Sequence, residues 1–139
     1  NGGLRILGSD VNTDVLESAV QGCFAEELLS PIPATFSKRY FDLASDKNNP
    51  YHRIKPEIQK LIQFRQFNLM SSDYPIATKF QLIFCRNVLY YLQSERREFL
   101  IKKLVDHLEE GGWLVLGITE SGYKIDKMKN RSISIYQKI

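Results

Sequence analysis

The chain has 139 residues, of which 43% are hydrophobic, enough for one compact domain and too few for two ordinary ones. Its 19 basic and 16 acidic residues give a formal charge of +3, and no basic run exceeds a pair, so a nucleic-acid-binding groove is disfavoured. No apolar run approaches the roughly 20 residues of a membrane helix, and the start lacks signal-peptide regions, so we expect a cytoplasmic protein without membrane insertion.

The two cysteines and two histidines are too dispersed for a metal site. Cys23 and Cys85 are expected to be small buried residues in a reducing compartment. His52 is expected at the surface of an edge strand, and His107 on the polar side of a helix. We therefore expect no bound metal.

The first residues predict half of a βαβ unit. The apolar run 4–8 predicts a strand, and Asn12 or Thr13 can cap the helix that follows, which Gly22 is placed to end. Asp10, after the strand, has two carboxylate oxygens that can accept hydrogen bonds from both hydroxyls of a ribose. The alternative is an ordinary turn aspartate at the end of a strand.

The pattern weakens from about residue 24 to residue 58, where prolines, a polar run at 45–49 and bulky aromatic residues occur together. This segment is too long for a simple loop and too rich in bulky residues for a disordered one. We interpret it as an insertion with its own small structure. Within it, residues 51–55 alternate like an edge strand, and a short helix is predicted for 56–63.

The second half is organised around the apolar run 80–84, which predicts a strand buried on both faces in the middle of a parallel sheet. Strands are also predicted for 63–67, 113–116 and 133–137. A helix capped by Ser94 is predicted to end before Gly111.

Polar residues follow four of these strands: Asp10, Asn68, Arg86 with Asn87, and the loop 117–121. Loops at the carboxyl ends of parallel strands open onto one edge of a sheet, where α/β proteins bind their ligands. We therefore expect a nucleoside site built from these loops.

Several motifs, taken in order, resemble the catalytic domain of the chemotaxis receptor methyltransferases of the CheR type. They are residues 10–16 (DVNTDVL), 68–69 (NL), 83–91 (IFCRNVLYY) and 111–120 (GGWLVLGITE). The resemblance covers essentially residues 1–139 and implies an α/β, Rossmann-like methyltransferase sheet in which residues 24–58 form the family's small β subdomain. In some members that subdomain docks a receptor tail peptide; here its loop 45–50 is polar and lacks glycine, so that tether is not predicted.

The resemblance implies S-adenosylmethionine as cofactor, with S-adenosylhomocysteine as product. It implies that Asp10 holds the ribose and that Asn68 and Leu69 lie against the adenosine. The implied reaction is methyl ester formation on glutamate side chains in the cytoplasmic region of chemotaxis receptors.

The same resemblance implies that Arg86 and Asn87 line the cofactor pocket, and that Tyr91 stands beside the methyl group. Arg86 and Tyr91 are the expected catalytic residues. The alternative for Tyr91 is an aromatic residue that anchors the following helix. Because glutamate is ionised at pH 7, the reaction needs in-line placement and desolvation of the carboxylate rather than a general base.

Members of this family also carry a helical domain and a first strand before the position of Leu4. Without that strand, two buried strands would have unpaired edges. We expect the catalytic domain to be incomplete at its N-terminus, as a fragment of a longer protein, unless a partner chain or a rearranged sheet supplies the strand. Alternative functions are a non-catalytic signalling or interaction module with this fold, and a methyltransferase for small molecules or nucleic acid.

Overall fold

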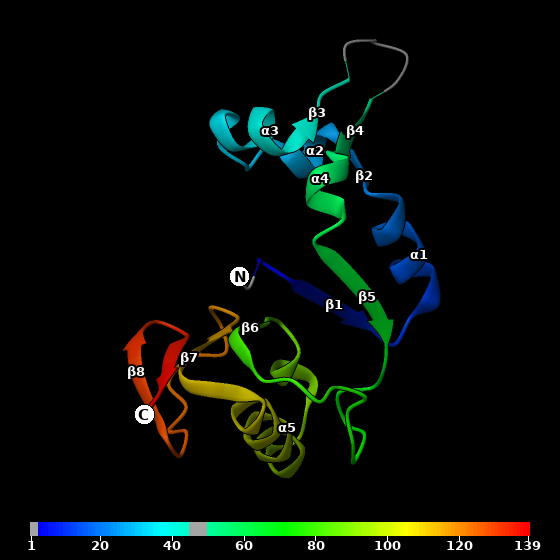
Figure 1. Ribbon diagram of the computed structural model, residues 1–139. Helices are drawn as coiled ribbons and strands as arrows, with labels where there is room; N and C mark the ends of the chain where they lie inside the picture. Colours follow the sequence, from blue (N-terminus) through cyan, green and yellow to red (C-terminus); the bar gives the residue numbers. More distant parts are fainter. Residues whose placement is uncertain (1–2, 45–49) are drawn as a thin grey trace. The chain divides into compact units, whose positions relative to one another are not determined.

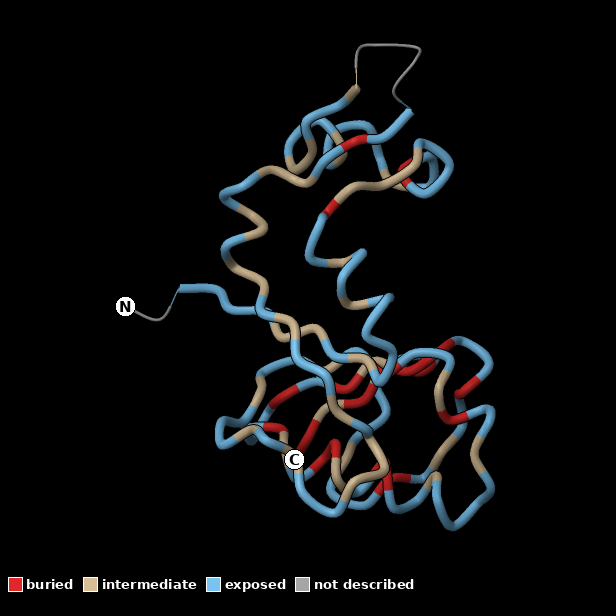
Figure 2. Tube along the Cα trace, turned by 90° about the vertical axis from the view of Figure 1, so that its right-hand side faces the viewer, coloured by how far each residue is buried: buried red, intermediate tan, exposed pale blue. Residues whose placement is uncertain are grey.

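The computed structural model describes residues 3–44 and 50–139. The chain divides into two compact units, Asn1–Asn68 and Leu69–Ile139, and both combine helices with strands (Figure 1). The predicted α/β class is confirmed. Most of the buried positions belong to the second unit (Figure 2).

The first unit begins with the predicted strand and helix. β1 (Ile6–Asp10) pairs in parallel with β5 (Ile62–Gln66), and α1 (Thr13–Gln21) connects out of β1. The Asn12 side chain accepts hydrogen bonds from the amides of residues 14 and 15, and Gly22 ends the helix in the left-handed conformation, at φ 63°. Both capping predictions are confirmed, because amide acceptors and glycine are the residue types that these helix ends need.

A three-stranded antiparallel sheet lies between α1 and β5 in the sequence, with strand order β2-β4-β3. In chain order, this part of the first unit contains β2 (Cys23–Ala25), α2 (Glu26–Leu29), α3 (Ala34–Tyr40), β3 (Phe41–Asp42), β4 (Tyr51–Ile54) and α4 (Pro56–Gln59). The polar run 45–49 lies outside the described residues.

The prediction that residues 51–55 form an edge strand is wrong. β4 is the central strand, because β2 and β3 pair with its two sides. His52 is consequently 8% exposed rather than at the surface, and its Nδ1 accepts a hydrogen bond from the Ala44 amide at 2.9 Å.

The second unit contains a four-stranded sheet of order β6-β7-β9-β8, in which β6 and β7 are parallel and the other pairs antiparallel. Its elements are β6 (Phe80–Cys85), the 3-10 helix η1 (Leu89–Tyr91), α5 (Ser94–Asp106), β7 (Leu108–Leu116), β8 (Met128–Ser132) and β9 (Ile135–Lys138). One face of this sheet packs against α5 to form the core of the unit. The core includes Leu100, Leu104, Leu114, Leu116 and Tyr136.

β6 differs from its prediction, because it is buried on one face only. Ile83 and Cys85 face the core, whereas Leu82 and Phe84 on the other face are 47% and 66% exposed. Among the described residues, β6 is also the end strand of its sheet. The apolar composition of the run is therefore not matched by burial within this unit.

Ser94 does not cap α5, whereas the helix ends before Gly111, as predicted. Ser94 is the first helical residue, and the N-cap is Gln93, which makes no side-chain capping bond. The helix ends at Asp106, because the buried Leu108 already pairs with β6 as the first residue of β7. β8 was not predicted, because its sequence MKNRS has no apolar alternation; its pairing with β9 forms the strand.

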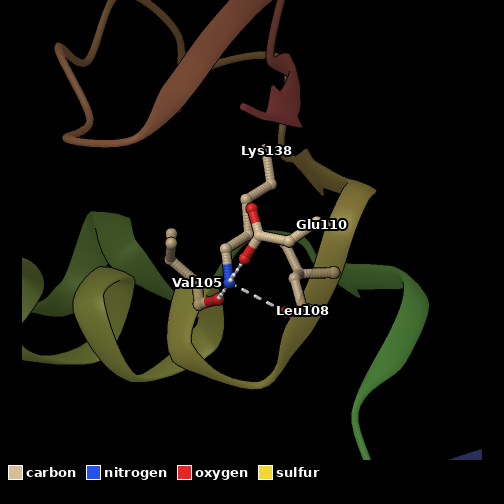
Figure 3. Close-up of polar contacts among 4 residues, drawn as sticks. All are labelled: Val105, Leu108, Glu110 and Lys138. Carbon is tan, nitrogen blue, oxygen red and sulfur yellow. Dashed lines mark hydrogen bonds and ion pairs between the residues drawn. The ribbon is translucent and has the colours of Figure 1, made fainter.

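The C-terminal end of α5 is capped by a lysine from β9. The Lys138 ammonium donates to the carbonyls of Val105 and Leu108 at 3.2 and 2.9 Å, and it forms an ion pair with Glu110 at 3.1 Å (Figure 3). Lys138 is 7% exposed. A cation at the carbonyl end of a helix satisfies acceptors that have no partner within the helix.

Replacing Lys138 by methionine should lower the stability of the chain by about 1–3 kcal/mol, because buried carbonyl groups lose their donor while the apolar stem is kept. Urea denaturation followed by circular dichroism measures this. Lys129→Met, on the exposed strand β8, is the matched control and should change stability by less than about 0.5 kcal/mol. Equal effects of the two substitutions would contradict the capping role.

Candidate functional site

Asp10 and Asn68 lie at the carboxyl ends of two neighbouring parallel strands. Asp10 is the last residue of β1 and pairs with Gln66 of β5, two residues before Asn68. The structure therefore brings Asp10 and Asn68 to the same edge of the two-stranded sheet, as predicted from their positions after strands.

The Asp10 carboxylate takes part in a local turn. Its Oδ1 accepts a hydrogen bond from the Asn12 amide at 2.9 Å, which is the turn role considered as the alternative. A carboxylate has two oxygens and about four acceptor positions. The turn bond thus leaves acceptor capacity for a ribose hydroxyl, and the two roles are compatible.

Leu69 has a packing role. It is partly buried against the hydrophobic core of the second unit, and its carbonyl accepts a hydrogen bond from the Tyr74 hydroxyl. That Leu69 contacts an adenosine stays a prediction.

Arg86, Asn87 and Tyr91 lie on one loop that follows β6. Arg86 is exposed, and in the part of the chain that the structure describes its guanidinium has no hydrogen-bond or ion-pair partner. Asn87 has a left-handed backbone, at φ 60°, a conformation that asparagine tolerates better than most residues. The loop thus presents a free cation and an amide at the carboxyl end of a parallel strand.

Tyr91 is 81% exposed and forms an edge-to-face pair with Tyr90, which is 70% exposed. The ring centroids are 5.5 Å apart and the ring planes meet at 87°. Since Tyr91 is so exposed, anchoring the following helix is not its role within this unit. Its ring and hydroxyl are available to a bound molecule.

A residue that was not predicted as a site residue holds this loop in shape. Glu120, after β7, is 0% exposed. Its Oε2 accepts hydrogen bonds from the amides of Asn87 and Gly117 at 2.9 and 2.8 Å, and its Oε1 accepts from the Tyr90 amide at 3.0 Å. The signal in the sequence was an acidic residue in a loop directly after a buried strand.

Gly117 has no room for a side chain beside these groups. A Cβ at this position would lie 2.6 Å from the Asn87 Oδ1 and 2.7 Å from the Glu120 Oε2. Glycine is therefore required for the close approach of the loops after β6 and β7.

Backbone hydrogen bonds favour the ionised form of the Glu120 carboxyl. Burial acts to raise the pKa of its carboxyl, but hydrogen bonds from backbone amides outweigh burial, so the pKa lies below its ordinary value. The donors are the amides of Gly117, Tyr90, Asn87 and Leu89. Burial, with a smaller effect of the Glu120 charge, raises the pKa of the Cys85 thiol to about 11.

The predicted site residues fall into two sets, one in each unit: Asp10 and Asn68 in the first, and Leu69 and the loop 86–91 in the second. No group of three or more histidine, cysteine or acidic residues able to hold a metal occurs among residues 3–44 and 50–139. In the same residues, none of the helices has the length and apolar character needed to cross a membrane.

The family model described as CheR methyltransferase, SAM binding domain, matches residues 1–137. The chain belongs to this family. The resemblance seen in the sequence is thus confirmed, together with the Rossmann-like methyltransferase fold and S-adenosylmethionine as the cofactor of the domain.

Individual proteins similar to this chain are named as chemotaxis protein methyltransferases. The chain is 35% identical over 118 residues to chemotaxis protein methyltransferase 2 of Pseudomonas aeruginosa, covering 85% of the chain and 42% of that protein. It is 30% identical to the chemotaxis protein methyltransferase of Borreliella burgdorferi (85% and 41%) and 28% identical to that of Escherichia coli (84% and 41%). The chain therefore spans about two-fifths of the length of these relatives.

Replacing Glu120 by glutamine should lower the free energy of unfolding by about 1–3 kcal/mol at neutral pH, because buried amides lose a charged acceptor. The folded state favours the ionised carboxyl, so the stabilisation is complete above about pH 4.5, the ordinary glutamate value, and is lost as the pH falls through the lowered folded-state pKa.

Urea denaturation of wild type and Glu120→Gln between pH 3 and pH 8 measures this difference. It should be constant from pH 6 to pH 8 and shrink below about pH 4.5. A difference that stays constant down to pH 3, or grows there, would contradict the lowered pKa.

Proposed function

We propose that this chain is the cofactor-binding part of a methyltransferase that forms methyl esters on glutamate side chains of chemotaxis receptors. The observation that carries the proposal is the match to the CheR methyltransferase domain across residues 1–137. The names of the relatives support a role in chemotaxis. The receptor's cytoplasmic region would be the substrate, and the site of action the cytoplasm.

The side chains present suit the cofactor. S-adenosylmethionine has a ribose diol, an adenine, a carboxylate and a sulfonium, and it supplies the methyl group when bound. Asp10 offers a carboxylate for the diol, Asn68 an amide for the adenosine, and Arg86 a cation for the carboxylate.

The substrate carboxylate needs placement rather than activation. A glutamate is ionised at neutral pH, so no general base is needed. A carboxylate oxygen of the substrate would attack the methyl carbon of the cofactor, and the electron pair of the broken carbon–sulfur bond would stay on the cofactor sulfur. Tyr91 is suited to orient that carboxylate through its exposed hydroxyl. Asn87 would lie beside the cofactor together with Arg86.

We also propose that a strand from another part of the protein, or from a partner chain, pairs with β6. The support is its position at the end of the sheet in the described residues. The exposed apolar surface of Leu82, Phe84 and the paired Trp113 indicates in addition that another element covers this face of the sheet. Strands of parallel sheets are usually covered on both faces.

Calorimetric titration with S-adenosylhomocysteine tests the cofactor site. Asp10→Asn keeps an acceptor for the Asn12 amide but removes the second carboxylate oxygen, so it should weaken binding about tenfold or more, roughly 1.4 kcal/mol. Asp42→Asn, at an exposed position in β3, is the matched control and should bind like wild type.

Absence of binding by the wild-type chain would refute the claim that the chain carries the cofactor site. Binding without methyl transfer to receptor glutamates in the full-length protein would favour the alternative, a non-catalytic module with this fold.

The exposed face of β6 should make the isolated chain self-associate, since an uncovered apolar strand at a sheet edge is a site of association. Sedimentation should show concentration-dependent association that Phe84→Lys reduces. Leu28→Lys replaces an apolar residue of α2 that is 65% exposed and should leave association unchanged. A monomeric wild-type chain would contradict this proposal.

A further inference from the structure

Glu120 connects two loops that follow neighbouring parallel strands. It lies four residues after the end of β7, and it accepts amide hydrogen bonds from Asn87 and Tyr90 in the loop after β6. Its own loop is fixed at the same time by the bond from the Gly117 amide. One carboxylate therefore sets the distance between the two loops.

The backbone of the loop 86–91 has little means of holding its own shape. Asn87 has a left-handed conformation, which few residues with a side chain adopt without support from their surroundings. η1 has only three residues, and the first amides of a helix lack partners inside it. Glu120 supplies an acceptor to these amides, as a capping side chain does.

The other end of the loop is fixed by a cation. The Arg97 side chain of α5 donates from Nε to the Leu89 carbonyl at 3.3 Å and from Nη2 to the Leu92 carbonyl at 2.9 Å. The amides are thus held by a buried anion and the carbonyls by a cation. The side chains of Arg86 and Tyr91 remain exposed on this fixed backbone.

We propose that Glu120 is a positioning residue for the methyltransferase site, which holds the loop 86–91 in the shape that presents Arg86, Asn87 and Tyr91 to the cofactor. The inference rests on the proposed function, since it assigns a task to the same loop. Glu120 does not contact the cofactor. It acts through backbone hydrogen bonds, by keeping the site formed before the ligand arrives.

The test combines amide hydrogen exchange with S-adenosylhomocysteine titration in three variants. Glu120→Gln is isosteric and keeps one acceptor oxygen, whereas Glu120→Asp keeps the charge but is one methylene too short to reach both loops. Glu98→Gln, on the exposed face of α5, is the matched control. The exchange of the amides of Asn87, Tyr90 and Gly117 reports on the loops directly, whether or not ligand binds.

In the wild type the hydrogens of these three amides should exchange slowly with solvent. Addition of S-adenosylhomocysteine should shift the NMR resonances of the same amides. In Glu120→Gln and Glu120→Asp, folded at the temperature of the titration, the amides should lose protection and the affinity should fall about tenfold. Glutamine should retain more affinity than aspartate, because its side chain still reaches the amides. Glu98→Gln should match the wild type in both measurements.

Unchanged affinity or unchanged protection in the Glu120 variants would overturn the positioning role. If the wild type binds no S-adenosylhomocysteine while its three amides are protected, the proposed function is refuted instead. The exchange data then decide alone whether Glu120 shapes the loop. If Glu120→Gln fails to fold, Glu120→Asp provides the same comparison.

Discussion

A carboxylate buried without a cationic partner is the constraint on which the loops of the second unit depend. In the described part of the chain no lysine or arginine forms an ion pair with Glu120, and peptide amides from two loops stabilise its charge. Removing the charge leaves amides unpaired, and removing the amides leaves a buried charge. The two loops and the carboxylate are therefore stable only together.

The hairpin formed by β8 and β9 contacts the loop after β7 and helps to hold it in place. Ser134, between β8 and β9, is 2% exposed, and its hydroxyl donates to the Gly117 carbonyl at 2.6 Å. Gly117 in turn donates its amide to Glu120. Hydrogen bonds thus run from the hairpin through the loop after β7 to the loop that carries Arg86 and Tyr91, so the packing of the last strands reaches the candidate site.

Local signals in the sequence predicted local structure well. The Asn12 cap and the Gly22 stop of α1 depend on neighbouring residues only, and both are present. The position of β6 was also predicted, but its exposure was not, because burial depends on which elements cover each face. Glu120 was missed for the same reason, since its donors lie some 30 residues earlier in the chain. The sequence located the loops of the site but not the group that joins them.

The raised pKa of Cys85 has a consequence for chemical selectivity. Cys85 is the last residue of β6 and directly precedes the loop 86–91, which is proposed to meet a methyl donor. A thiolate is a stronger nucleophile toward alkyl carbon than a carboxylate is. With a pKa of about 11, only about one thiol in ten thousand is ionised at pH 7. Burial therefore disfavours methylation of this thiol by a donor bound at the proposed site.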